Sequence, residues 1–99
     1  MKYVLGIDQG GTKTCAIVAD SKGNVLGMGK SGGAYHISDG IKRSMETIKD
    51  ASSKALEKAN ISLKDIAAVG AGITGMDWPE DYELLKSSLK KLLGTKNIY

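Results

Sequence analysis

The sequence predicts an α/β domain built around one mixed β-sheet. Three short runs rich in β-branched residues come first, and later runs of strand length alternate with apolar residues at helical spacing. The chain has 99 residues, of which 41% are apolar and 25% are charged, with a single proline. These values suit one globular core and exclude a multidomain chain, so we expect a single domain over residues 1–99.

The first three elements are predicted to be strands. Residues 3–7 are apolar on both faces, which predicts a buried central strand that ends at Asp8. Residues 14–19 and 25–30 are the second and third strands, joined by a turn signal at residues 20–24. Because both connections are short, we expect an antiparallel meander.

From Ser38 onward the period changes to that of an amphipathic helix. Ser38 or Asp39 can cap its N-terminus, and Asn60 can end it in the left-handed conformation. Asp50 and Lys54 stand at the spacing of a helical ion pair. The apolar face comprises Ile41, Met45, Ile48, Ala55 and Ala59.

The second half predicts one more interior strand, a helix and the start of another strand. Residues 66–73 are apolar throughout and have the length of a strand. Residues 77–80 supply a cap, a first-turn proline and a carboxylate, and therefore favour a second helix that ends before Gly94. We expect a fifth strand to begin at residues 96–99.

The element order βββαβαβ fits a ribonuclease-H-like arrangement, in which helices pack on a mixed sheet. Right-handed crossovers place the two helix-linked strands beside the first strand and parallel to it. We therefore expect a five-stranded sheet in the order 3-2-1-4-5, with strand 2 antiparallel.

Composition excludes several function classes. The net charge is +3, and acidic and basic residues alternate, so no stripe for a nucleic acid stands out. A single cysteine, Cys15, excludes an internal disulfide and fits a reducing compartment. No stretch has the length of a signal peptide or a membrane span. We expect a cytoplasmic protein with neither a nucleic acid nor a membrane as its partner.

The stretch from Asp8 to Thr14 carries the clearest chemistry. Gly10 and Gly11 let backbone N–H groups approach an anion, while Thr12 and Thr14 offer hydroxyls and Lys13 adds charge. Asp8 is placed to hold Mg²⁺ through water. The alternative is a plain β-hairpin in which the two glycines supply positive φ and Asp8 is a turn acid.

This stretch resembles the phosphate-1 motif of the actin, Hsp70 and sugar-kinase superfamily. Together with residues 32–36 and 72–77, residues 6–14 resemble the N-terminal half-domain of the BadF/BadG/BcrA/BcrD ATPase family, which includes N-acetylglucosamine kinases. The resemblance covers essentially the whole chain, in order and in spacing. It implies the N-terminal, actin-like ATPase lobe of a longer protein.

The resemblance also implies roles for particular residues. Gly10, Gly11, Thr12, Lys13 and Thr14 would bind the phosphates of ATP, and Asp8 would bind Mg²⁺. The small sugar would contact Tyr35, His36, Thr74 and Gly75. Tyr35 departs from the family, whose sugar loop carries Asn there, and His36 is equally well explained as a solvated loop histidine.

The family's catalytic aspartate, the base that accepts the proton of the sugar hydroxyl, falls beyond Tyr99. We therefore expect the chain to be inactive alone and to need a C-terminal lobe of the same protein as its partner. We also expect an exposed apolar edge or face that favours association, with a homodimer as one form.

Two alternatives remain open: the activator ATPase of a 2-hydroxyacyl-CoA dehydratase or benzoyl-CoA reductase system, and a sugar-sensing module without catalysis. Residues 70–75 also spell G-x-G-x-x-G, the pattern of a dinucleotide site, but the context disfavours it. The dinucleotide motif needs a helix that starts at once, whereas here the helix cap comes later, at Asp77.

Overall fold

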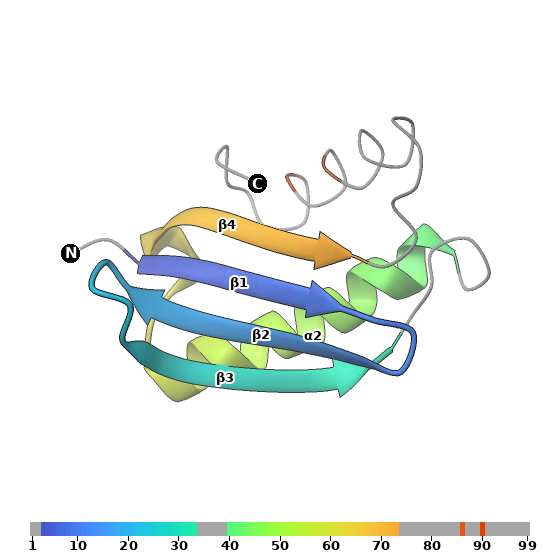
Figure 1. Cartoon of the computed structure of the whole chain (residues 1–99), viewed down its shortest axis with the longest axis horizontal. Coiled ribbons are helices and arrows are strands. Elements are labelled where there is room, and N and C mark those ends of the chain that lie inside the picture. The colour runs from blue at the N-terminus through green and yellow to red at the C-terminus, as the bar shows by residue number, and fades with distance from the viewer. Residues whose placement is uncertain (1–2, 34–39, 74–85, 87–89, 91–99) are drawn as a thin grey trace.

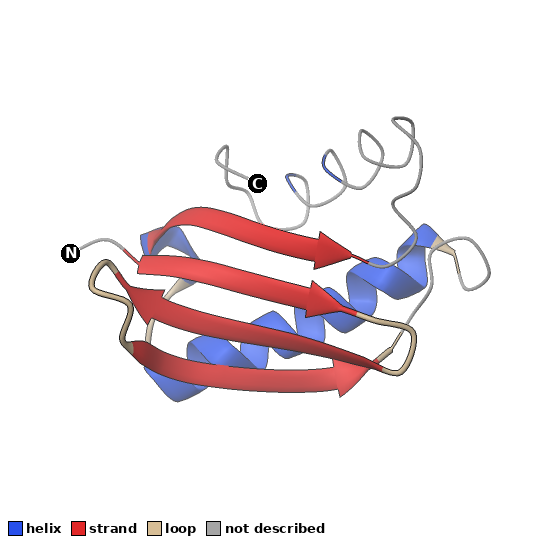
Figure 2. Ribbon diagram, viewed as in Figure 1, coloured by secondary structure: helices blue, strands red, loops and turns tan. Residues whose placement is uncertain are grey.

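The computed structural model of the chain describes residues 3–33 and 40–73, together with residues 86 and 90. These residues form one sheet with a helix across one of its faces (Figures 1 and 2). The elements, in order, are β1 (Tyr3–Gln9), β2 (Lys13–Asp20), β3 (Val25–Gly32), α2 (Ile41–Ala59), the short 3₁₀ turn η1 (Leu63–Asp65) and β4 (Ile66–Ile73).

The sheet has the strand order β3-β2-β1-β4. Strand β2 is antiparallel to both β1 and β3, while β4 lies parallel to β1. The first four places of the predicted order are therefore confirmed. The predicted fifth strand and second helix fall almost entirely outside the described residues.

The strand β1 continues past the predicted end at Asp8. Gln9 still pairs with Thr14 of β2 and with Ile73 of β4, so the strand ends one residue later. The turn that follows is therefore confined to residues 10–12. Asp8 is the last residue but one of β1 and is still part of the sheet.

The helix α2 ends as expected but begins differently. Asn60 is left-handed (φ 57°, ψ 44°), and the N–H groups of Asn60 and Ile61 close the helix on the carbonyls of Glu57 and Leu56, each at 3.1 Å. The prediction that Ser38 or Asp39 caps the helix was wrong, because the N-cap is Gly40. Gly40 has φ 88° and makes no side-chain cap, so the backbone conformation there favours glycine.

The core lies between α2 and one face of the sheet. It comprises Leu5, Ile7, Ala16, Val18, Ile48, Ala51, Ala55, Ile66 and Val69. Two glycines of β3 let the helix come close. A Cβ on Gly27 would overlap the carbonyl oxygen of Ala55, and one on Gly29 would overlap that of Ala51.

The exposed large apolar side chains of the described strands are Val4, Ile17, Val25, Leu26 and Met28, and strand alternation places Val4, Ile17 and Met28 on the face opposite α2. Val4 is 40% exposed, so the expectation that β1 is buried on both faces was wrong. The exposed apolar edge or face expected from the sequence was attributed to the fifth strand at residues 96–99, which lie outside the described residues. Among the described helices, none is long and apolar enough to cross a membrane.

Candidate phosphate-binding site

The turn between β1 and β2 is a tight hairpin at one end of the sheet. The N–H of Gly10 donates to the carbonyl of Lys13 at 2.8 Å and closes the turn. Gly11, Thr12 and Lys13 are exposed, as is Asp8 just before the turn. The structure thus presents a carboxylate, a cation and the backbone of a glycine pair to solvent within a few residues.

Neither glycine of the turn is needed for the backbone conformation. Among the glycines of residues 3–33 and 40–73, only Gly23 and Gly40 have positive φ. Glycine at 10 and 11 therefore has another reason, and the positive-φ argument for a plain hairpin does not hold.

Packing does not require these glycines either. A Cβ on Gly10 would make an ordinary 3.6 Å contact with the carbonyl oxygen of Lys13, and one on Gly11 would meet no atom of the described chain within 4 Å. The missing side chain at Gly11 leaves open space over the turn. That space suits a group that must approach the backbone closely, such as a phosphate.

Asp8 lies on the sheet face opposite α2. Successive side chains of a strand alternate between faces, and the neighbours Ile7 and Gln9 are both buried on the α2 side. Across the sheet Asp8 pairs with Cys15 of β2 and with Gly72 of β4. A Cβ on Gly72 would meet no described atom within 4 Å, so no described side chain covers Gly72 beside the carboxylate.

This setting suits a hydrated divalent cation. Magnesium keeps several waters and binds proteins through one or two carboxylates together with substrate phosphates. In the part of the chain that the structure describes, no three His, Cys, Asp or Glu side chains gather into a metal cage.

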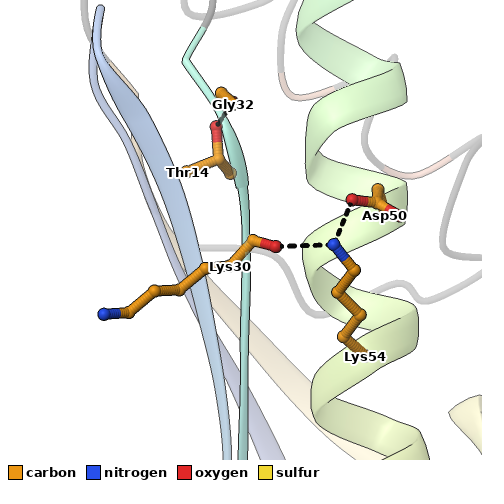
Figure 3. A network of polar contacts seen from close by, with 5 residues as sticks. All are labelled: Thr14, Lys30, Gly32, Asp50 and Lys54. Atoms are coloured by element: carbon orange, nitrogen blue, oxygen red, sulfur yellow. Dashed lines mark hydrogen bonds and ion pairs between the residues drawn. The ribbon is translucent and has the colours of Figure 1, made fainter.

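Thr14 is placed differently from its neighbours. Its side chain is fully buried, and its Oγ1 donates to the carbonyl oxygen of Gly32 at 2.9 Å, as Figure 3 shows. The hydroxyl proton is thus already used by the chain. Of the five residues predicted at the phosphates, Thr14 is the one that the structure turns away from solvent.

Gln9 is a residue that the sequence did not single out. Its side chain is 1% exposed, and its Nε2 donates to the carbonyl of Ser44 at 2.9 Å and to Oγ1 of Thr47 at 2.7 Å. The last residue of β1 is thereby fastened to the first turns of α2. Strand alternation could have found it, because Gln9 shares the buried face with Leu5 and Ile7.

A second polar connection joins α2 to β3 near the same end of the sheet (Figure 3). The Nζ of Lys54 lies 2.9 Å from Oδ2 of Asp50 and donates to the carbonyl of Lys30, also at 2.9 Å. The predicted helical ion pair is confirmed. Hydrogen bonds from Lys54 and then Ser31 lower the pKa of the Asp50 carboxyl from its ordinary value.

The four residues predicted at the sugar, Tyr35, His36, Thr74 and Gly75, lie outside the described residues. The strands that lead to them are described. Strand β3 ends at Gly32, which pairs with Lys13, and β4 ends at Ile73, which pairs with Gln9. The chain therefore leaves both strands beside the turn at residues 10–12, called the glycine turn below.

Comparison with known proteins finds kinases among the relatives of this chain. Glycerol kinase of Sinorhizobium fredii is 44% identical over 77 residues, which cover 69% of this chain and 15% of that protein. N-acetyl-D-glucosamine kinase of Dictyostelium discoideum is 34% identical over 105 residues, covering 91% of this chain and 30% of that protein. The chain thus spans less than a third of the length of these relatives.

Two solved structures share the fold. A protein assigned to the N-acetylglucosamine kinases, from Chromobacterium violaceum, superposes with a TM-score of 0.75 at 22% identity, over 97% of this chain and 34% of that one. Component A of the (R)-2-hydroxyglutaryl-CoA dehydratase of Acidaminococcus fermentans gives a TM-score of 0.55 at 19% identity, over 100% of this chain and 30% of that one.

The match to a family is broader than any of these single likenesses. The BadF/BadG/BcrA/BcrD ATPase family matches residues 5–87, which include the glycine turn, α2 and all four described strands except the first two residues of β1. The chain belongs to the BadF/BadG/BcrA/BcrD ATPase family.

Proposed function

We propose that this chain is the ATP-binding N-terminal lobe of a sugar kinase similar to N-acetylglucosamine kinase, which phosphorylates a small sugar with MgATP. The observation that carries the proposal is the glycine turn. Neither the φ of Gly11 nor its packing against the described residues requires glycine there, yet Gly11 is exposed, as are Asp8 and Lys13. A ligand that approaches the backbone explains this combination.

In this proposal the turn binds and orients the phosphates. Backbone N–H groups of Gly11 and Thr12 and the ammonium of Lys13 offset negative charge, and Asp8 holds Mg²⁺ through water. MgATP supplies the phosphoryl group. Because phosphoryl transfer depends mostly on positioning and charge neutralisation, these residues contribute although none of them is the base.

The sugar assignment rests on the relatives and on the two neighbouring segments. The relatives include kinases named for glycerol and for N-acetyl-D-glucosamine. Tyr35, His36, Thr74 and Gly75 would contact the sugar, in segments that the chain enters from the ends of β3 and β4. Adenosine, the second phosphate loop and the catalytic base would come from the C-terminal lobe, so the chain would not turn over alone. We place the whole protein in the cytoplasm.

An activator ATPase is the second candidate, favoured by the fold shared with the dehydratase component. Such activators usually carry Ser where this chain has Thr12, and lack the Lys-Thr pair at positions 13 and 14. These departures favour the kinase. Assays of the full-length protein separate the two: the kinase transfers phosphate to an amino sugar, and the activator hydrolyses ATP without a sugar acceptor.

Binding by the chain itself tests the shared part of both candidates. Amide resonances of the ¹⁵N-labelled chain would be followed while magnesium tripolyphosphate or adenosine is added. The proposal expects tripolyphosphate to shift Gly10, Gly11 and Thr12 selectively, and adenosine to leave them in place. Shifts spread evenly over all lysines would indicate unspecific attraction and contradict the site.

A further inference from the structure

The glycine turn is in close contact with Gly33, the residue that directly follows β3. A Cβ on Gly33 would overlap the carbonyl group of Gly11 and lie 2.5 Å from the carbonyl carbon of Thr12. Real Cβ atoms do not come so near to a backbone. Gly33 therefore touches the turn over the same two residues whose N–H groups are proposed to face the phosphates.

The contact is a matter of space and not of backbone conformation. Among the described glycines, positive φ occurs at Gly23 and Gly40 and not at Gly33, so φ does not oppose an alanine there. Within the described residues, the penalty at this position comes from the added methyl group. The neighbouring Gly32 is different, because a Cβ there would meet nothing nearer than a guanidinium nitrogen of Arg43 at 3.9 Å.

A hydrogen bond holds the same junction together. Thr14 follows the turn by two residues, and its buried Oγ1 donates to the carbonyl of Gly32, just before Gly33 (Figure 3). Strand pairing reaches the same point, since Lys13 pairs with Gly32. The start of β2 is thus tied to the end of β3 on one side, while the Gly33 backbone limits the turn on the other.

We propose that Gly33 is a positioning residue, which with Thr14 sets the direction of the Gly11 and Thr12 backbone for phosphate binding. The inference rests on the proposed function of the turn and adds a residue outside it. An ordinary contact needs about 3.4 Å or more, so with a methyl group at position 33 the turn and the chain at that position must separate by on the order of 1 Å. Displacements of that size in a binding constellation can cost on the order of 100-fold in rate.

The test compares Gly33→Ala with Gly32→Ala in the chain as it is. Amide shifts of Gly10, Gly11 and Thr12 are recorded first without ligand, and then during titration with magnesium tripolyphosphate. Gly33→Ala is expected to shift the free Gly11 and Thr12 amides and to weaken binding at least about tenfold. Gly32→Ala is expected to do neither.

The free spectra keep this inference separate from the function. If the wild-type chain does not bind tripolyphosphate, the proposed function fails, but displaced turn amides in Gly33→Ala still support the positioning role. Unchanged turn amides and unchanged affinity in Gly33→Ala would overturn it. Equal effects from Gly32→Ala would overturn it as well, because that methyl group does not reach the turn.

A second pair of variants covers the case in which Gly33→Ala does not fold. Thr14→Val removes the hydrogen bond to Gly32 at nearly constant shape, and Thr14→Ser keeps the hydroxyl. The inference expects Thr14→Val to displace the Gly11 and Thr12 amides before any ligand is added, and Thr14→Ser to restore them. If Thr14→Val leaves these amides in place, the junction does not position the turn.

Discussion

Two pairs of glycines in this chain serve opposite purposes. Gly27 and Gly29 of β3 are buried, and added Cβ atoms would run into the backbone of α2. At the β1–β2 turn, Gly10 is half-buried and Gly11 exposed; among the described atoms, an added Cβ would make one ordinary contact at Gly10 and none within 4 Å at Gly11. The first pair is explained by the fold alone. The second pair is not, and this difference is the strongest reason to assign the turn to a ligand.

The comparison separates stability from binding. Where the chain itself fills the space above a glycine, substitution should harm folding, whether or not a ligand exists. Where the space is empty, substitution should leave folding intact and harm only what enters from outside. The same contrast holds for two neighbouring glycines. The turn occupies the place of a Cβ on Gly33, whereas a Cβ on Gly32 would make a single described contact, at 3.9 Å.

The largest effect on stability is expected for Gly29→Ala. Its methyl group would overlap the carbonyl of Ala51 and lie 2.7 Å from the amide nitrogen of Ala55, so α2 must lift from the sheet. Overpacking of this kind costs about 1–3 kcal/mol, and we expect the upper end because backbone atoms cannot rotate away. Urea unfolding measures the loss.

Gly70→Ala is the matched control, since a Cβ on that strand glycine would meet no described atom within 4 Å. We expect a change within about 0.5 kcal/mol there. If both variants unfold at the same urea concentration, the backbone of α2 does not pack directly against Gly29.

A smaller loss is expected for Gln9→Leu, which keeps a buried side chain but removes the hydrogen bonds to Ser44 and Thr47. The carbonyl of Ser44 keeps the hydrogen bond from Thr47 at 3.0 Å, which limits the cost. We expect about 1 kcal/mol, measured by thermal unfolding. Because Gln9 directly precedes the turn, its loss should also broaden the amide signals of Gly10 and Gly11. Sharp signals at unchanged positions would show that the turn is independent of α2.

The smallest effect concerns the Asp50–Lys54 ion pair within α2, whose lysine also donates to the carbonyl of Lys30 in β3. The folded pKa of Asp50 is lowered, so its ionised form stabilises the fold above the ordinary value of 3.8 and loses this effect as pH falls through the folded value. Asp50→Asn should therefore be slightly less stable than the wild type at neutral pH, with the difference vanishing in acid. The pair is half-exposed, so added salt should reduce the difference. A difference that grows in acid would contradict this sign.

Much of the fold could be predicted because the patterns are local. Alternation and short turns gave the meander, and helical spacing with Asn60 gave the end of α2. The residues at the turn were also accessible to sequence reasoning, since glycines, an acid and a lysine within seven positions are unusual.

What could not be predicted depends on register and close packing. Thr14 was expected at the phosphates, but its face of β2, shared with Ala16 and Val18, is the one that α2 covers. The tasks of Gly27, Gly29 and Gly33 were equally hidden. A glycine against which a helix packs and a glycine that leaves room for a ligand look the same in a sequence. Only the atoms around them distinguish the two.

The central claim, that the space over Gly11 belongs to phosphate, is tested most directly by Gly11→Val. The Cβ of the valine would meet no described atom within 4 Å and no positive φ opposes it, and its two methyl groups would take up space over the turn. The measurement is the unfolding midpoint of the variant together with its titration by magnesium tripolyphosphate. The account predicts an essentially unchanged midpoint and loss of the shifts at Gly10 and Thr12. A folded variant that binds tripolyphosphate as the wild type does would contradict it, and loss of the fold would return Gly11 to a purely structural role.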